Sequence, residues 1–244
     1  MKHGTSVRTS FPRRTPKHTF PGIATSLPFV ALPVDTRNQI LEGYINYLRE
    51  HGEPPVSTFR FAHSLGLDER GFFSQFSHLD AVESAMWAGV VTKVASALES
   101  DCEGAEWGSF SAKQRMLTFQ LAFCEEALSW RSLLLQRIGK IGFLARPPYL
   151  KGFENEFHAF ASRVMAHGGS TGEIAERGQA AALYPKIFYA HFRSVIDFHL
   201  KDESERFERT DAYIEKSVTL AFDLLGRQAI DSAFDLGKFL LARP

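Results

Sequence analysis

Apolar residues recur every three or four positions through nearly all of the chain after residue 34, which is the spacing of one face of an α-helix. The first such stretch contains Ile40, Leu41, Tyr44, Ile45 and Leu48. The alternating pattern of a half-buried strand appears nowhere, and no segment is repeated. The sequence therefore predicts an all-α protein.

Start and stop signals divide this region into separate helices. The first begins at Asp35 or Thr36, either of which can accept from the free N–H groups of a helix start, and ends at His51 and Gly52. Three more N-terminal helices are expected at about 58–65, 68–76 and 79–100, followed by a loop at 104–108. Glycine and proline breaks place the remaining helices at about 109–128, 130–138, 149–167, 173–182, 184–201, 208–226 and 230–241.

Residues 1–34 differ from the rest of the chain. They contain basic residues and no acidic ones, together with many Ser, Thr and Pro residues, a composition that disfavours packed secondary structure. We expect a disordered basic tail. It is either an inert extension, which includes a wrongly assigned start, or an arm that contacts phosphates, or an organellar transit peptide.

Overall charge and hydropathy narrow the class of protein. Lys plus Arg and Asp plus Glu both number 28, so no global charge excess favours nucleic acid or membrane, and any charge argument must be local. No apolar run is long enough to cross a bilayer, and the N-terminus lacks the apolar segment of a secretory signal. Cys102 and Cys124 are interpreted as buried thiols of a cytoplasmic protein.

Sequence signatures of catalysis or metal binding are not found. His158 and His167 are nine residues apart, and His191 and His199 are eight apart, so neither pair has the i, i+4 spacing of helical metal ligands. No nucleophile elbow, phosphate-binding loop or carboxylate pair is present. We expect no catalytic residues, no metal, no cofactor and no enzymatic activity.

Three short helices, a long fourth and a larger helical region together resemble the tetracycline-repressor (TetR) family of bacterial regulators. The similarity lies in ILEGYINYLREHG (40–52), FRFAHSLGL (59–67) and GFFSQFSHLDAVESAMW (71–87), and the segment at 206–240 resembles the end of a less-studied TetR-like branch. The resemblance implies a helix-turn-helix at 35–80, with three helices, and a larger ligand-binding and dimerisation domain at 81–244.

The resemblance also implies a set of DNA contacts, namely Arg60, Arg70, Ser74, Gln75 and His78. The sequence departs from the family at Phe73, where a tyrosine usually contacts a phosphate, and at Leu79, where a lysine usually approaches the DNA. Asp68 and Glu69 replace small residues, and residues 35–94 hold five basic against eight acidic side chains, which disfavours phosphate binding. The two acids could instead be favourable charges at a helix N-terminus, facing away from DNA.

Aromatic residues make up 13% of the chain, and most must form the core of the larger domain. A minority could line an apolar cavity for a small molecule or lipid, as the family commonly has. The candidates are Phe119, Phe123, Trp130, Phe157, Phe188 and Phe192.

Helices 184–201 and 208–226 have apolar residues on more than one side, so each needs a second buried face. A two-fold interface of four helices would provide it, and we expect a homodimer.

Two hypotheses of function follow. The first is a TetR-like DNA-binding transcriptional regulator that responds to an apolar small molecule. The second is a protein of the same fold that has lost DNA binding and acts as a lipid-binding or kinase-partner protein, as lipid-binding proteins of ubiquinone biosynthesis suggest by analogy.

Overall fold

The computed structural model describes residues 35–101, 105–175 and 178–225, and the secondary structure of these residues is helical throughout, with no strand. This confirms the all-α prediction. The predicted tail at 1–34, the predicted helix at 230–241 and Cys102 lie outside the described residues.

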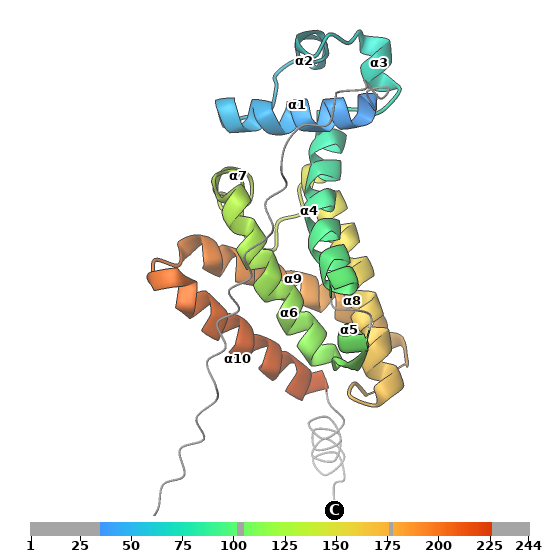
Figure 1. Cartoon of the computed structure of the whole chain (residues 1–244), viewed down its shortest axis with the longest axis vertical. Helices are drawn as coiled ribbons and strands as arrows, with labels where there is room; N and C mark the ends of the chain where they lie inside the picture. The colour runs from blue at the N-terminus through green and yellow to red at the C-terminus, as the bar shows by residue number, and fades with distance from the viewer. Residues whose placement is uncertain (1–34, 102–104, 176–177, 226–244) are drawn as a thin grey trace, which may run out of the picture. The chain divides into compact units, whose positions relative to one another are not determined.

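The first three helices begin and end near the predicted residues. They are α1 (Thr36–His51), α2 (Thr58–Ser64) and α3 (Glu69–Phe73) (Figure 1). Asp35 accepts a hydrogen bond from the N–H of Arg37 at the start of α1, as a capping carboxylate does. α3 is shorter than predicted, because the helix ends at Phe73 rather than near residue 76.

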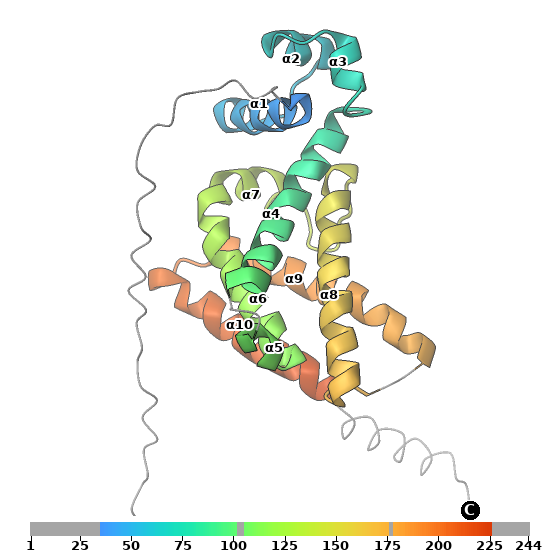
Figure 2. The ribbon, with the colours of Figure 1, turned by 45° about the vertical axis from the view of Figure 1, so that its right-hand side comes forward.

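Helix α4 (Leu79–Asp101) packs along α8 (Lys151–Thr171), and Figures 1 and 2 show the two side by side. The N–H of Gly152 donates to Ser84 Oγ at 2.7 Å where the helices cross. A Cβ on Gly152 would overlap the Ser84 carbonyl oxygen. The crossing therefore requires glycine at position 152.

The other helices complete the core beside this pair. They are α5 (Ala105–Ser109), α6 (Ala112–Ala127), α7 (Arg131–Arg137), α9 (Tyr184–Lys201) and α10 (Glu208–Leu225), with 3-10 turns at Leu128–Trp130, Pro148–Leu150, Gly178–Leu183 and Glu205–Phe207. α9 packs against α6 and α8, and α10 packs against α6 and α9. The short α5 occupies part of the predicted loop at 104–108.

Two predictions for the end of α8 were wrong. The helix continues through Gly168 and Gly169 to Thr171, and it ends at Gly172, which has φ 76°. The predicted helix at 173–182 does not form as one helix, because residues 173–175 are non-helical and only a 3-10 turn follows. Glu173 instead places its carboxylate at the start of α6, where it accepts hydrogen bonds from the N–H groups of Ala112 (2.6 Å) and Lys113 (3.0 Å), which have no partner within their own helix.

The connection between α9 and α10 is built around Asp202, which is buried. Its carboxylate accepts hydrogen bonds from the N–H and hydroxyl groups of Ser204 and Thr210, at 2.7–2.9 Å. Burial alone would raise the pKa of Asp202, but these four bonds hold it well below its ordinary value. Asp202 thus fixes the angle at which α10 leaves α9.

Candidate functional site

The N-terminal helices form a tightly packed three-helix unit. Tyr44 of α1, Phe61 of α2 and Phe72 of α3 are buried, and their rings meet edge to face with centroids 5.8 and 6.3 Å apart. Gly66 adopts φ 73° in the turn between α2 and α3, a conformation that favours glycine. The first three helices and this turn therefore form one packed scaffold.

Two of the predicted DNA contacts are exposed basic side chains on this scaffold. Arg60 lies on α2 and Arg70 lies on α3. Neither guanidinium forms an ion pair with any residue in the described part of the chain. Both are therefore available to an external anion.

The other three predicted contacts have local structural partners. Ser74 Oγ donates to the Gly71 carbonyl oxygen at 2.8 Å, and Gln75 Nε2 donates to Ser74 Oγ at 3.3 Å. His78 Nδ1 accepts from the N–H of Ala81 at 3.0 Å and so caps the start of α4. The structure thus places these three side chains between the end of α3 and the beginning of α4.

The acidic residues ahead of α3 have a structural role. Asp68 Oδ1 accepts a hydrogen bond from the N–H of Gly71 at 2.7 Å and caps α3, and Glu69 lies in its first turn. This arrangement agrees with the interpretation of both as helix N-terminal charges. Phe73, at the position where the family has tyrosine, is half exposed, whereas Leu79 is partly buried.

Glu83 of α4 is fully buried and links α1, α4 and α7. Its carboxylate accepts hydrogen bonds from the Tyr44 hydroxyl (2.9 Å), Trp87 Nε1 (3.1 Å) and two nitrogens of Arg137 on α7 (2.8 and 2.9 Å). Burial, followed by the negative charge of Glu83, raises the pKa of Tyr44 well above its ordinary value. Burial alone would lower the pKa of Arg137, but hydrogen bonding to Glu83 raises it. The network keeps Arg137 charged and Tyr44 protonated.

Sequence reasoning did not identify this network. Glu83 was counted among the acids that oppose DNA binding, but its charge is paired with Arg137, which lies outside the counted segment. A usable signal existed, because Glu83 follows Val82 within the apolar stripe of α4, where a carboxylate needs a partner.

Four of the six predicted ligand contacts come together in the core of the larger domain. The ring of Phe119 lies 5.8 Å from Phe157 and 5.6 Å from Phe192, and Phe123 lies 4.7 Å from Phe192. All four side chains are fully buried, with Phe153 and Phe160 beside them. We name these six rings the aromatic cluster.

The other two predicted ligand contacts have different partners. Trp130 Nε1 donates to Glu126 at 3.0 Å, and the guanidinium of Arg49 lies 5.1 Å from the Trp130 ring, which ties the end of α1 to the larger domain. Phe188 packs against Phe222 of α10 with ring centroids 5.4 Å apart.

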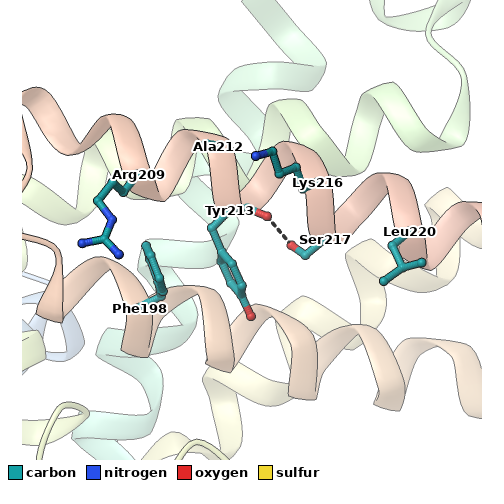
Figure 3. Close-up of a pocket in the computed structure, with 7 residues that line it drawn as sticks. All are labelled: Phe198, Arg209, Ala212, Tyr213, Lys216, Ser217 and Leu220. Atoms are coloured by element: carbon teal, nitrogen blue, oxygen red, sulfur yellow. Dashed lines mark hydrogen bonds between the residues drawn. The ribbon is translucent and has the colours of Figure 1, made fainter.

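A groove of about 490 Å³ runs between α9 and α10. Figure 3 shows its lining, in which the rings of Phe198 and Tyr213 lie nearly parallel, with centroids 4.6 Å apart. Large apolar side chains on the same two helices are exposed, with Ile187 at 56% and Leu220 at 59%. The predicted dimer helices therefore present an apolar surface.

A row of hydrogen-bonded side chains links α6, α9 and α10. His191 of α9 is mostly buried between Gln120 of α6, whose Nε2 lies 3.3 Å from His191 Nδ1, and Ser217 of α10, whose Oγ lies 2.8 Å from His191 Nε2. Ser217 in turn donates to the Tyr213 carbonyl oxygen at 2.6 Å. Burial lowers the pKa of His191 to about 4, so the ring is neutral at pH 7.

Within the described residues, no group of three or more His, Cys, Asp or Glu side chains could hold a metal ion. None of the helices in the same ranges is long and apolar enough to span a bilayer.

Solved structures with the same fold have low sequence identity to this chain. One of them, from Shewanella sp. PV-4, is described as a "putative tetR family transcription regulator". It matches with a TM-score of 0.53 and 16% identity, covering 77% of this chain and 95% of that one. A protein of unknown function from Rhodococcus sp. RHA1 matches with a TM-score of 0.50 and 17% identity, covering 79% and 96%. At these identities the likeness shows the fold.

Sequence comparison identifies the family. No curated protein sequence matches this chain. The family described as "Tetracyclin repressor-like, C-terminal domain" matches residues 115–240, more than half of the 244 residues. Because it covers more than half of the chain, this match shows that the chain belongs to the tetracycline-repressor (TetR) family of transcriptional regulators.

Proposed function

We propose that the protein is a homodimeric DNA-binding regulator that responds to an apolar small molecule. Residues 35–80 would form the DNA-binding domain, and residues 81–244 the ligand-binding and dimerisation domain. The single observation that supports this most is the pair of unpaired, exposed guanidinium groups, Arg60 and Arg70, on an intact helix-turn-helix scaffold.

The acidic excess of residues 35–94 remains when internal ion pairs are taken into account. Glu83 pairs with Arg137 and Lys93 pairs with Glu126, so leaving both out gives four basic against seven acidic side chains. Arg60 and Arg70 have no such partner within the described residues. The proposal therefore rests on these two local cations, which can neutralise phosphates, and not on the charge of the whole segment.

DNA binding is tested with the DNA upstream of the protein's own gene, by electrophoretic mobility shift and fluorescence anisotropy. We expect Arg60→Ala and Arg70→Ala each to weaken binding about tenfold. Arg163→Ala is the matched control, because Arg163 is an exposed arginine on α8 that pairs with Glu99 near the end of α4 away from the scaffold. Equal effects of all three substitutions would contradict the assignment.

The ligand response would be a population shift. A ligand that binds one geometry of the dimer better than the other favours that geometry, and so changes the spacing of the two DNA-binding domains. The Glu83 network supports this proposal, because it ties α1 to α4 and α7 and would transmit a displacement of either helix.

The dimer would form through α9 and α10, whose apolar surface supports the assignment. Ile187→Glu and Leu220→Glu should each convert the dimer to monomer in sedimentation velocity at micromolar concentration. Leu144→Glu is the control, since Leu144 is an equally exposed leucine (67%) in the loop after α7. A dimer that survives both substitutions would place the interface elsewhere.

A second function is supported by one observation. Phe73 keeps an aromatic ring at the position of the family's phosphate-binding tyrosine and lacks its hydroxyl, and Leu79 replaces a lysine. A TetR-fold protein that binds a lipid or a kinase partner without DNA would tolerate both changes. Absence of DNA binding at low salt, with lipid co-purifying in mass spectra, would favour this alternative.

A further inference from the structure

Arg193 of α9 is a buried cation with few partners. The residue is 1% exposed, and its Nη1 donates to the Ala145 carbonyl oxygen at 3.1 Å. Its Nε and Nη2 are buried and have no hydrogen-bond partner, and no carboxylate in the described part of the chain pairs with it. A guanidinium stays charged when buried, and a buried unpaired charge is costly. The site is therefore suited to an anion.

Two further polar atoms beside Arg193 are also unsatisfied. Tyr189 lies one helical turn before Arg193, and its hydroxyl is buried without a well-formed hydrogen bond. Burial raises the pKa of Tyr189, and the adjacent Arg193 opposes the rise, first as a hydrogen-bonding group and then as a charge. The His158 ring lies 5.4 Å from the Tyr189 ring, and its Nε2 is buried without a hydrogen bond, 3.8 Å from Glu154.

The acidic group beside His158 is Glu154, and it is paired with a different arginine. Glu154 Oε1 pairs with Arg146 at 2.8 Å, and Arg146 itself lies 5.9 Å from the Tyr189 ring. The surroundings of Tyr189 thus hold two guanidinium groups and a single paired carboxylate. This excess of positive charge is local, because the whole chain is electrically balanced.

The polar site adjoins the aromatic cluster. The Tyr189 ring lies 5.9 Å from Phe157 and 6.3 Å from Phe153, and Phe192 precedes Arg193 in the sequence. Any molecule that reaches Arg193 would therefore have aromatic rings within reach of its remaining atoms. The combination of one buried cation and an apolar wall fits an acid with an apolar body.

We propose that Arg193 and Tyr189 bind the carboxylate of an apolar organic acid, whose hydrocarbon part packs against Phe153 and Phe157. The guanidinium would donate two parallel hydrogen bonds from Nε and Nη2, and the tyrosine hydroxyl a third. This inference rests on the proposed ligand-sensing function and adds the chemical class of the ligand. The loop at 138–147, which supplies the Ala145 carbonyl, would move to admit it.

The experiment compares carboxylates with their neutral amides in isothermal titration and thermal unfolding of the full chain. The probes are octanoate against octanamide and phenylacetate against phenylacetamide. We expect the better-fitting acid to raise the unfolding temperature by about 5 °C at saturation, and its amide to bind more than about thirtyfold more weakly. Arg193→Gln should abolish the preference for the acid, Arg193→Lys should retain part of it, and the exposed control Arg163→Gln should leave it unchanged.

Tyr189→Phe is a second, milder variant that removes one donor and keeps the ring, so the test does not depend on how Arg193→Gln folds. Equal binding of acid and amide, no binding of either acid, an unchanged preference in both Arg193 and Tyr189 variants, or equal binding of inorganic phosphate would each overturn the proposal. Equal binding of acid and amide would leave apolar ligand sensing standing. Because the assay contains no DNA, its result is independent of whether the protein binds an operator.

Discussion

The buried Glu83 carboxylate makes the sharpest stability prediction. Glu83→Gln keeps the size of the side chain and removes its charge, which leaves the Arg137 guanidinium without the partner that it contacts at 2.8 and 2.9 Å. Breaking a buried ion pair by neutralising one member costs about 3–5 kcal/mol. We expect the lower end, about 3 kcal/mol, because the Arg137 side chain is 17% exposed and water can partly solvate it.

This loss corresponds to a fall of about 6–12 °C in the unfolding temperature of a chain of this size. Urea unfolding should be followed by circular dichroism and by tryptophan fluorescence at a fixed protomer concentration, because Trp87 donates to the same carboxylate and reports on it locally. The control is Arg163→Gln, which breaks the exposed pair with Glu99 at 3.0 Å and should cost less than about 1 kcal/mol.

A double-mutant cycle of Glu83→Met and Arg137→Met separates the pair from its surroundings. The double variant replaces both charges by apolar groups, and it should be more stable than the Glu83→Met single variant, which leaves Arg137 without its partner. A Glu83→Gln variant as stable as Arg163→Gln would refute the view that the network is a buried, energetically coupled unit.

Three further predictions concern pH and packing. The pKa of His191 is about 4 when folded and near 6.5 when unfolded, so the unfolded chain binds the proton first, and stability should fall by about 1–2 kcal/mol between pH 7 and pH 5. The urea midpoint of His191→Asn should fall less over that range, but it should not be constant, because burial also lowers the pKa values of His158 and His199. The lowered pKa of Asp202 means that its ionised carboxylate stabilises the fold at neutral pH, and this stabilisation is lost as the pH falls below about 4. Asp202→Asn should cost about 2 kcal/mol at pH 7 in the same urea assay. Gly152→Ala should destabilise the protein by about 1–3 kcal/mol, because the new methyl group meets the Ser84 carbonyl. The control Gly89→Ala lies on an open face of α4 and should stabilise the protein by about 0.5–1 kcal/mol. Similar effects of the two substitutions in thermal unfolding would refute the close approach of α4 and α8.

The positions of most helices could be predicted from the sequence because their signals are local. Asp35 caps the helix that it or Thr36 was expected to begin, and Gly52 and Gly66 occupy the turns where positive φ is needed. The apolar spacing of α9 and α10 likewise predicted both helices to within a residue of their ends.

The failures came from contacts between residues distant in the sequence. Glu173 looked like a helix-forming residue, but its carboxylate is used to cap α6, some sixty residues earlier in the chain. Gly168 looked like a helix break, but it lies inside α8 where a side chain would meet Ile174 and Ala112. Neither requirement leaves a signal in the neighbouring sequence.

The candidate sites were only partly predictable for the same reason. The segments at 59–67 and 71–87 predicted the positions of α2 and α3 and of their exposed arginines, because the packing within these two helices is local in the sequence. The pairing of Glu83 with Arg137 and the isolation of Arg193 depend on how α4, α7 and α9 pack, and a charged residue within an apolar stripe was their only trace.

DNA binding by the helix-turn-helix is the central claim, and the salt dependence of binding tests it most directly. Arg60 and Arg70 on each of two protomers would neutralise about four phosphates, which gives a slope of about −3 to −4 in log Kobs against log salt concentration for the upstream DNA. Replacing both arginines by alanine should bring the slope close to zero. A wild-type slope near zero, or the same slope in the double variant, would contradict the account.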